Sequence, residues 1–358
     1  VTKKKHGPKY QQVVDALRRD IAMQVYLPGE RLPSENELVE RFDVSLITAR
    51  RAYSELTAAG EVYRIKGKGS FVALMRPQGE APAAGARLVS FVMMDYHEAD
   101  ESILEIILGA QKALSRANYQ MTILSSKSAD SEQAVLERCL SGGISGVLIF
   151  STNPDDSVDT ARRLTQNRIP VVFIDRSPTR QPCSAVATNN YDGGYRLAEH
   201  LTDLGHRRIL FAGDRSHINT EIERHKGYRD CLNNLGLYDP DLSIFNAYQN
   251  DDRLKDHLIN RRASAVCCVN DRLAIWLMDR LQEMGLKVPQ DIAITGFDDL
   301  ALARRYGLTT MRQDFSRMGS QAAEMVLEWL HRPDRQGNLA VSLPAELLVR
   351  ESSGLKRA

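Results

Sequence analysis

The 358-residue sequence predicts a small α+β domain of three helices and a β-hairpin, followed by a larger α/β body with parallel sheets. In residues 1–74 apolar side chains recur at helical spacing before a hairpin pattern. From residue 87 short β-rich runs alternate with helical stretches instead. Between them, residues 73–86 are rich in Ala, Pro and Gly, which is typical of a linker. We therefore set the domains at 1–74 and 87–358, joined by a linker at 75–86.

Composition excludes several classes of protein. No apolar run approaches the roughly 18 residues needed to span a bilayer, so no membrane contact is expected. The basic amino terminus lacks the apolar segment of a secretory signal, which favours a cytoplasmic location. Five cysteines without a C-x-x-C pair argue against a disulfide framework and a zinc site, and we expect no metal and no cofactor.

Charge is divided unevenly along the chain. Residues 1–76 carry six Lys and eight Arg against three Asp and six Glu, a net +5, whereas the whole chain carries +1. A basic head on an acidic body suggests a polyanion as partner for the head alone. Charge by itself would favour a merely solvated basic surface over a polyanion site.

The helices of the first domain follow from spacing and capping. The first helix is indicated by apolar residues at helical intervals, namely Tyr10, Val13, Leu17 and Ile21. Ser34 and Glu37 form a capping box that begins the second helix. Ser45 can cap a third helix, whose predicted buried stripe is Ala49, Ala52, Tyr53 and Leu56.

Two short strand-like runs, 62–65 and 70–73, flank the sequence Lys66-Gly67-Lys68-Gly69 and predict a hairpin. Three helices plus this hairpin form a winged helix-turn-helix, in which the third helix enters the DNA major groove. The segment resembles the GntR family through residues 32–35, 44–45, 48, 50–52 and 67–72. The resemblance implies that the head binds double-stranded operator DNA.

Candidate DNA contacts lie on the third helix and the wing. Ser45, Thr48 and Arg50 are candidates for phosphate or base contacts, with Lys66 and Gly67 at the wing. The family usually has arginine at the positions of Asn36 and Leu46, so the operator should differ from the commonest family sequence. Leu46 and Ile47 lie off the core stripe, and they either pack locally or touch thymine methyl groups.

The body alternates apolar strands with helices, a pattern typical of parallel sheets that are covered on both faces. The predicted strands are 88–93, 121–124, 147–150, 171–174, 209–212, 265–269 and 292–295.

An ordered series of motifs in the body resembles the LacI/GalR regulators and the periplasmic sugar-binding proteins. The motifs lie at residues 172–176, 190–194, 204–209, 224–228, 270–271, 285–289, 296–299, 308–310, 318–319 and 348–352. The resemblance implies a type I periplasmic-binding-protein-like fold of two α/β subdomains. In such a fold the chain crosses from one subdomain to the other several times. It also implies a ligand cleft at their junction and a homodimer.

Ligands of parallel sheets bind beyond the carboxyl ends of the strands, where polar residues of this sequence also fall. Matched to the family motifs, the candidate hydroxyl ligands are Asp175, Arg224, Asn270 and Asp298, with Phe315 as an aromatic platform. Weaker candidates are Asp95, Ser151, Tyr96, His97 and Gln313. The strand-end aspartates could instead cap helices or turns, which is the role expected for Asp271. Trp276 is expected to pack or to join a dimer interface.

A GntR-type head on a LacI-type body resembles the AraR-like repressors. The resemblance implies a homodimeric, ligand-responsive repressor of sugar-utilisation genes, released by a small-molecule effector such as a pentose. The alternative is an activator or a co-repressor-dependent regulator that senses a nucleoside or a phosphorylated metabolite. No nucleophile, base or metal cluster points to an enzyme.

Overall fold

The computed structural model describes residues 9–22, 25–26, 30–58, 62–65, 69–72, 87–94, 101–126, 129–151, 153–215, 218–260, 263–333 and 337–354. The chain divides into two compact units, Val1–Gly85 and Ala86–Ala358. The predicted linker at 75–86 lies outside the described residues. Within the described ranges no helix is long and apolar enough to cross a membrane.

The first unit contains the helices and hairpin that the sequence predicts. Helices α1 (Lys9–Ala22), α2 (Glu35–Phe42) and α3 (Leu46–Ala58) precede the antiparallel strands β1 (Val62–Ile65) and β2 (Gly69–Val72). The capping box is confirmed, since Ser34 Oγ accepts the Glu37 N–H and Glu37 accepts the Ser34 N–H. The predicted stripe of α3 is fully buried. A backbone hydrogen bond ties the hairpin to the segment that precedes α2, since the Leu32 N–H donates to the Ser70 carbonyl at 2.9 Å.

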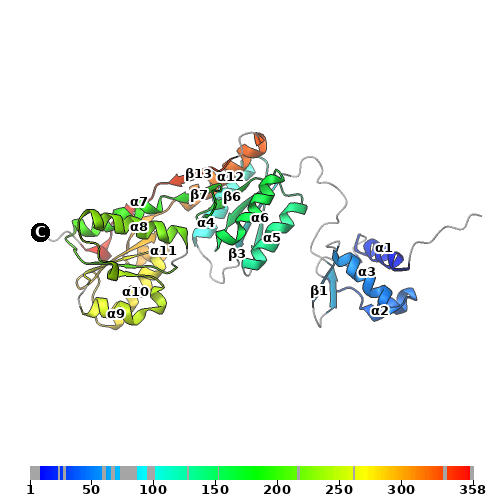
Figure 1. Cartoon of the computed structure of the whole chain (residues 1–358), viewed down its shortest axis with the longest axis horizontal. Helices are drawn as coiled ribbons and strands as arrows, with labels where there is room; N and C mark the ends of the chain where they lie inside the picture. Colours follow the sequence, from blue (N-terminus) through cyan, green and yellow to red (C-terminus); the bar gives the residue numbers. More distant parts are fainter. Residues whose placement is uncertain are drawn as a thin grey trace, which may run out of the picture. The chain divides into compact units, whose positions relative to one another are not determined.

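The first subdomain of the body is a six-stranded parallel sheet in the order β13-β7-β6-β5-β3-β4. Its strands are β3 (Leu88–Met94), β4 (Gln120–Ser126), β5 (Gly146–Phe150), β6 (Val171–Ile174), β7 (Ala185–Thr188) and β13 (Ala340–Leu343). Its helices are α4 (Glu101–Arg116), α5 (Ala129–Ser141), α6 (Pro154–Gln166) and α12 (Phe315–His331) (Figure 1). Helices α4 and α12 share one hydrophobic cluster with the sheet, and α5 and α6 share another. Neighbouring residues of one strand, such as Leu148 and Ile149, enter different clusters, so both faces are covered.

The second subdomain has a six-stranded sheet in the order β14-β12-β11-β10-β8-β9, in which only β14 is antiparallel to its neighbour. Its strands are β8 (Ile209–Ala212), β9 (Ser243–Ile244), β10 (Ala265–Cys268), β11 (Ala293–Asp298), β12 (Thr309–Arg312) and β14 (Glu346–Leu348). Its α-helices are α7 (Asn190–Asp203), α8 (Asn219–Asn234), α9 (Asp251–Ile259), α10 (Asp271–Glu283) and α11 (Ala301–Arg305). Short 3-10 turns are η1 (Pro240–Leu242), η2 (Ala247–Gln249) and η4 (Glu351–Ser353).

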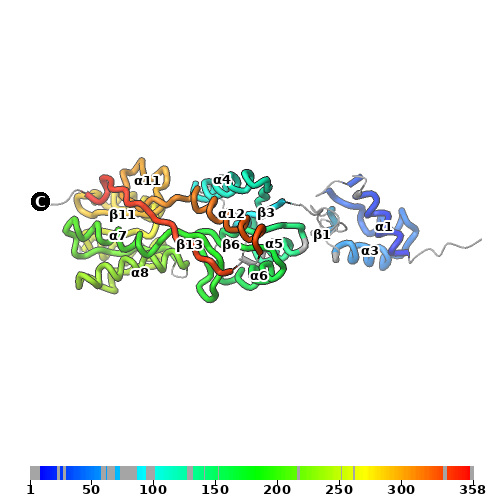
Figure 2. The backbone as a smooth tube through the Cα atoms, turned by 90° about the horizontal axis from the view of Figure 1, so that it is seen from above, coloured from blue at the N-terminus to red at the C-terminus, as the bar shows by residue number. Residues whose placement is uncertain are grey.

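The chain passes between the two sheets at three places, as the sequence resemblance implies. It leaves the first sheet after β7, returns after β12 through α12, and leaves again between β13 and β14. Figure 2 shows the last passage as the red segment that runs from β13 toward the second subdomain. Each subdomain is therefore built from separated parts of the sequence.

Each subdomain contains a pair of helices in very close contact. A Cβ atom added to Gly227 of α8 would lie 2.0 Å from the Tyr191 carbonyl oxygen, and one added to Gly194 of α7 would lie 2.0 Å from that of Arg224. In the first subdomain, a Cβ on Gly319 of α12 would lie 1.9 Å from the Ile106 oxygen of α4. Only glycine allows backbones to approach this closely.

Candidate functional site

Arg224 lies buried on α8 and makes contacts with three parts of the second subdomain. Its Nε donates to Asn190 Oδ1 at 2.8 Å and its Nη1 donates to the Val269 carbonyl at 2.7 Å. Its guanidinium lies 3.7 Å from the centroid of the Phe297 ring. The helix crossing at Gly194 and Gly227 fixes the backbone of this residue. The two hydrogen bonds and the ring contact hold the planar guanidinium in one orientation.

Asp298, at the end of β11, lies beside Arg224. Its Oδ1 is 3.7 Å from Arg224 Nη2 and accepts a hydrogen bond from Gln313 Nε2 at 2.7 Å. Gln313 in turn accepts the hydroxyl of Thr188, which ends β7 of the first subdomain. The structure thus brings together Arg224, Asp298 and Gln313 among the predicted ligand residues. It adds Asn190, which follows a strand that the sequence did not predict.

Asp175 closes β6 of the first subdomain in the left-handed region, with φ at 63°. Asp298 also has a positive φ, 125°. Such backbone angles are costly for residues other than glycine and concentrate at functional sites. Asp175 Oδ2 lies 3.7 Å from Arg176 Nε, while its Oδ1 is buried and accepts no hydrogen bond within the described part of the chain. A buried acceptor in this state costs free energy until a donor reaches it.

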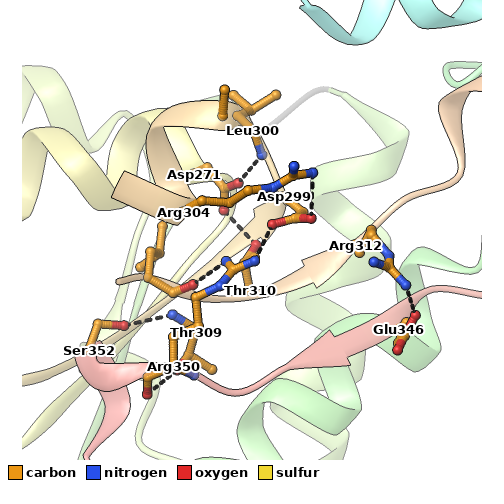
Figure 3. Close-up of polar contacts among 12 residues, drawn as sticks. Asp271, Asp299, Leu300, Arg304, Thr309, Thr310, Arg312, Glu346, Arg350 and Ser352 are labelled. Atoms are coloured by element: carbon orange, nitrogen blue, oxygen red, sulfur yellow. Dashed lines mark hydrogen bonds and ion pairs between the residues drawn. The ribbon is translucent and has the colours of Figure 1, made fainter. Parts of the chain in front are cut away.

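A polar network supports the segment that follows Asp298 (Figure 3). Asp271 is fully buried and accepts the Leu300 N–H at 2.9 Å and the Thr310 hydroxyl at 2.6 Å. Burial raises the pKa of Asp271, and the negative charge of Asp298 raises this pKa further. Through these two hydrogen bonds the Asp271 side chain braces the loop. The N-cap of α10 is Asn270, so at this helix the capping role expected for Asp271 belongs to its neighbour.

Asp299 forms the second part of this network. Its buried carboxylate pairs with Arg350 at 2.5 Å and with Arg304 at 3.1 Å (Figure 3). Arg350 also donates to the Leu308 carbonyl at 2.7 Å. The motif at 348–352 thus supplies Arg350 as a brace for the turn at residues 298–300.

Three other predicted ligand residues have structural partners. Asn270 Oδ1 accepts the Leu273 N–H at 2.8 Å at the start of α10. Ser151 is fully buried and donates to Glu132 at 2.8 Å. Phe315 is 7% exposed and belongs to the hydrophobic cluster of the first subdomain. Their side chains offer less to a ligand than the strand-end aspartates do. Asp95, Tyr96 and His97 lie outside the described residues.

Two buried glutamates support turns at strand ends, although no sequence motif marks them. Glu221 accepts the backbone N–H groups of Asp214 and Arg215 at 3.0 and 2.7 Å, and it fixes the turn after β8. Glu132 accepts the hydroxyls of Ser151 and Ser157 after β5. Burial raises the pKa of both carboxyls. Each glutamate lies in the first turn of a helix and beside the end of a strand. A glutamate in this sequence position is the pattern by which the two residues could be predicted.

A pocket of about 510 Å³ lies where the two subdomains meet. Its lining residues are Glu101, Tyr248, Arg272, Ile275, Trp276, Asp279, Leu300 and Leu302. Trp276 meets Tyr248 edge to face, with ring centroids 5.0 Å apart. Trp276 therefore both packs against Tyr248 and lines this pocket. The described ligand candidates Asp175, Arg224, Asn270 and Asp298 do not line this pocket.

Two contacts, which we call the latches, tie the subdomains together. Glu101 of α4 accepts the Ala301 N–H of α11 at 3.0 Å. Asn219, the first residue of α8, accepts the Ser177 N–H at 3.3 Å and donates to the Ser177 hydroxyl at 3.1 Å. Both latches would break if the subdomains moved apart at these points.

The predicted DNA contacts divide into exposed apolar side chains and polar side chains with internal partners. Leu46 and Ile47 are exposed in the first turn of α3. Ser45 Oγ lies 2.9 Å from Thr48 Oγ1, and Arg50 Nε donates to Glu35 at 2.8 Å. Asn36 lies exposed on α2. Lys66 and Gly67 lie outside the described residues.

Comparisons with known proteins match both units. Residues 9–72 match the model of the bacterial regulatory proteins of the gntR family, and residues 198–353 match a periplasmic binding protein-like domain. The chain is 30% identical to the arabinose metabolism transcriptional repressor of Geobacillus stearothermophilus, over 98% of this chain and 99% of that protein. It is 29% identical to the protein of that name from Halalkalibacterium halodurans, over 96% of each. A solved complex of the transcriptional regulator CelR with cellobiose matches with a TM-score of 0.68 at 23% identity, over 86% of this chain and 91% of that one.

Proposed function

The chain belongs to the family of the arabinose metabolism repressors, which join a gntR-type head to a periplasmic-binding-protein-like body, and we propose that a monosaccharide releases it from its operator. It is a transcriptional repressor and not an enzyme. A pentose such as arabinose is the first candidate effector, because the relatives of that name match over nearly the whole chain. The place of action is the cytoplasm, where operator DNA lies.

The observation that carries the sugar proposal is the pair of strained aspartates at strand ends in the two subdomains. Asp175 and Asp298 both have positive φ, and the buried Oδ1 of Asp175 accepts no hydrogen bond from the described residues. Sugar hydroxyls donate and accept, so they suit carboxylates, the guanidinium of Arg224 and the amide of Gln313. A hydroxyl bound to Asp175 would satisfy its buried oxygen.

Charge favours a neutral ligand over a phosphorylated one. Arg224 lies beside Asp298, and Arg176 lies beside Asp175, so each of these guanidinium groups already faces a carboxylate. A phosphate dianion would have to compete with those carboxylates and would also be repelled by them. A free sugar meets no such repulsion.

The proposed mechanism uses a homodimer that holds two α3 helices over a two-fold symmetric operator. Sugar would stabilise one arrangement of the two subdomains and thereby alter the spacing of the heads. Release from the operator requires a coupling free energy of roughly 1–3 kcal/mol between the sugar and DNA sites.

The first test measures the melting temperature of the full chain with a panel of free pentoses, hexoses, nucleosides and sugar phosphates. A ligand at about 100 times its Kd stabilises the fold by ~2.7 kcal/mol, so the effector is expected to raise the melting temperature clearly. Arg224→Lys and Asp298→Asn should abolish that rise. Lys226→Ala, at an exposed position of α8, is the matched control.

The same ligand must then lower operator affinity in a fluorescence-anisotropy titration. A rise with a nucleoside or a sugar phosphate, and with no free sugar, would contradict the sugar proposal. A ligand that tightened operator binding would contradict release and assign it the role of a co-repressor.

A further inference from the structure

The first turn of α3 presents two large apolar side chains to the surface of the head. Ile47 is 78% exposed and Leu46 is 37% exposed. Neither belongs to the hydrophobic cluster that the described residues of the head form. Exposed apolar groups on an otherwise polar helix face cost free energy in water. A binding partner that covers them would recover this free energy.

The polar side chains around them are already bonded within the head. Ser45 Oγ accepts the Thr48 N–H at 3.2 Å and lies 2.9 Å from Thr48 Oγ1, so both residues serve the start of α3. Arg50 pairs with Glu35 of α2, and the Arg51 guanidinium lies 4.1 Å from the centroid of the Tyr10 ring. The first turn therefore offers apolar surface where hydrogen-bonding groups would be expected.

We propose that Leu46 and Ile47 form an apolar reading face that recognises the C5-methyl groups of thymines in the major groove. This inference rests on the DNA-binding role of the head. The third helix of a winged helix-turn-helix enters the major groove, and residues at its amino-terminal end meet base edges. Thymine is the base that presents a methyl group there.

The same face discriminates against cytosine. Cytosine lacks the methyl group and presents an amino donor at the neighbouring position. An isoleucine or leucine side chain accepts no hydrogen bond, so it would strip water from that donor without replacing the bond. The operator is therefore expected to carry thymine where Ile47 and Leu46 make contact.

The test removes thymine methyls one at a time. The full-length wild-type chain first selects its operator from a pool of random duplexes, and each thymine is then replaced singly by deoxyuridine. Wild-type affinity is expected to fall about fourfold at one or two positions per half-site, the effect of one lost methyl contact. Ile47→Ala and Leu46→Ala should each make one of those positions insensitive to the replacement.

Val25→Ala is the matched control, since Val25 is 57% exposed and lies outside α3. It should retain the wild-type pattern, and all three variants should keep the wild-type melting temperature because none of the side chains is buried.

An Ile47→Ala variant that weakens binding to thymine and uracil duplexes equally would overturn the inference. A wild-type chain whose affinity does not change with any replacement would also overturn it. A wild type that selects no sequence would overturn the DNA-binding role as well. Retained operator binding without any sugar response would contradict only the proposed effector.

Discussion

In the first subdomain α4 and α12 cross at Gly109 and Gly319, and in the second subdomain α7 and α8 cross at Gly194 and Gly227. The first crossing lies within an apolar cluster that contains Ile106 and Met318. The second holds the backbone of Arg224, whose guanidinium enters a polar centre with Asn190 and Asp298. The same packing device therefore serves stability in one subdomain and orients a candidate ligand residue in the other.

The largest expected effect concerns the charged brace of the second subdomain. Asp299→Ala leaves Arg350 without its buried partner, and it should cost about 3–5 kcal/mol in the free energy of unfolding. Glu346→Ala removes a partner of Arg312 from an exposed ion pair and should cost at most about 1 kcal/mol (Figure 3). Urea denaturation of both variants measures the difference. Equal losses would mean that Asp299 does not brace the subdomain.

The helix crossings come next. Gly227→Ala and Gly319→Ala each force a Cβ against a backbone oxygen and should cost about 1–3 kcal/mol. Only Gly227→Ala should also weaken binding of the sugar found in the melting panel, because it displaces Arg224. Gly337→Ala meets nothing within 4 Å and is the control. Equal loss of sugar affinity in both crossing variants would break the distinction between the subdomains.

A pH effect is expected from His225, the neighbour of Arg224. Burial, aided by Arg229 and opposed by Asp230, lowers the pKa of His225 to about 4. The unfolded chain would have a pKa of about 6.5 there, so the contribution to stability is complete above that pH. It is lost as the pH falls from about 6.5 toward 4. Melting temperatures of wild type and His225→Gln over this range should show a shallower pH dependence in the variant, and parallel curves would contradict the prediction.

The smallest expected effect concerns the latches. Asn219→Ala and Glu101→Ala each remove hydrogen bonds between the subdomains, worth about 0.5–1.5 kcal/mol per bond. If ligand binding requires the subdomain arrangement seen here, sugar affinity should fall by about two- to tenfold, measured by calorimetry. Asn233→Ala on α8 and Glu105→Ala on α4 change similar side chains away from the latches. An unchanged affinity in both latch variants would show that the arrangement does not limit binding.

In the body the sequence predicted strands that are largely apolar runs and missed five of the described strands, namely β7, β9, β12, β13 and β14. Strands such as β5 and β10 are buried along their whole length, so their composition reveals them. Strand β12 contains Thr309, Thr310 and Arg312, and its place is set by pairing with β11 and the distant β14. Strands β7, β13 and β14 likewise depend on partners far away in the sequence. Such pairing leaves no local pattern to read.

The candidate site was predictable where a residue follows a recognised strand. Asp175 and Asp298 were found in this way, and the structure places Arg224 within 4 Å of Asp298. Asn190 was missed because β7 was missed, and Glu221 because its role depends on the turn after β8. The internal partners of Ser151 and Phe315 could not be foreseen, since burial depends on contacts from other elements.

The three passages of the chain between the sheets also set the order in which the protein can fold during synthesis. The head needs residues only up to Val72, but the first sheet gains its edge strand β13 only when Leu343 has been made. At roughly 5–20 residues per second, tens of seconds separate the first strand of that sheet from its last. During this time the first sheet of the nascent body remains incomplete. The DNA-binding head, in contrast, can fold as soon as its own residues have left the ribosome.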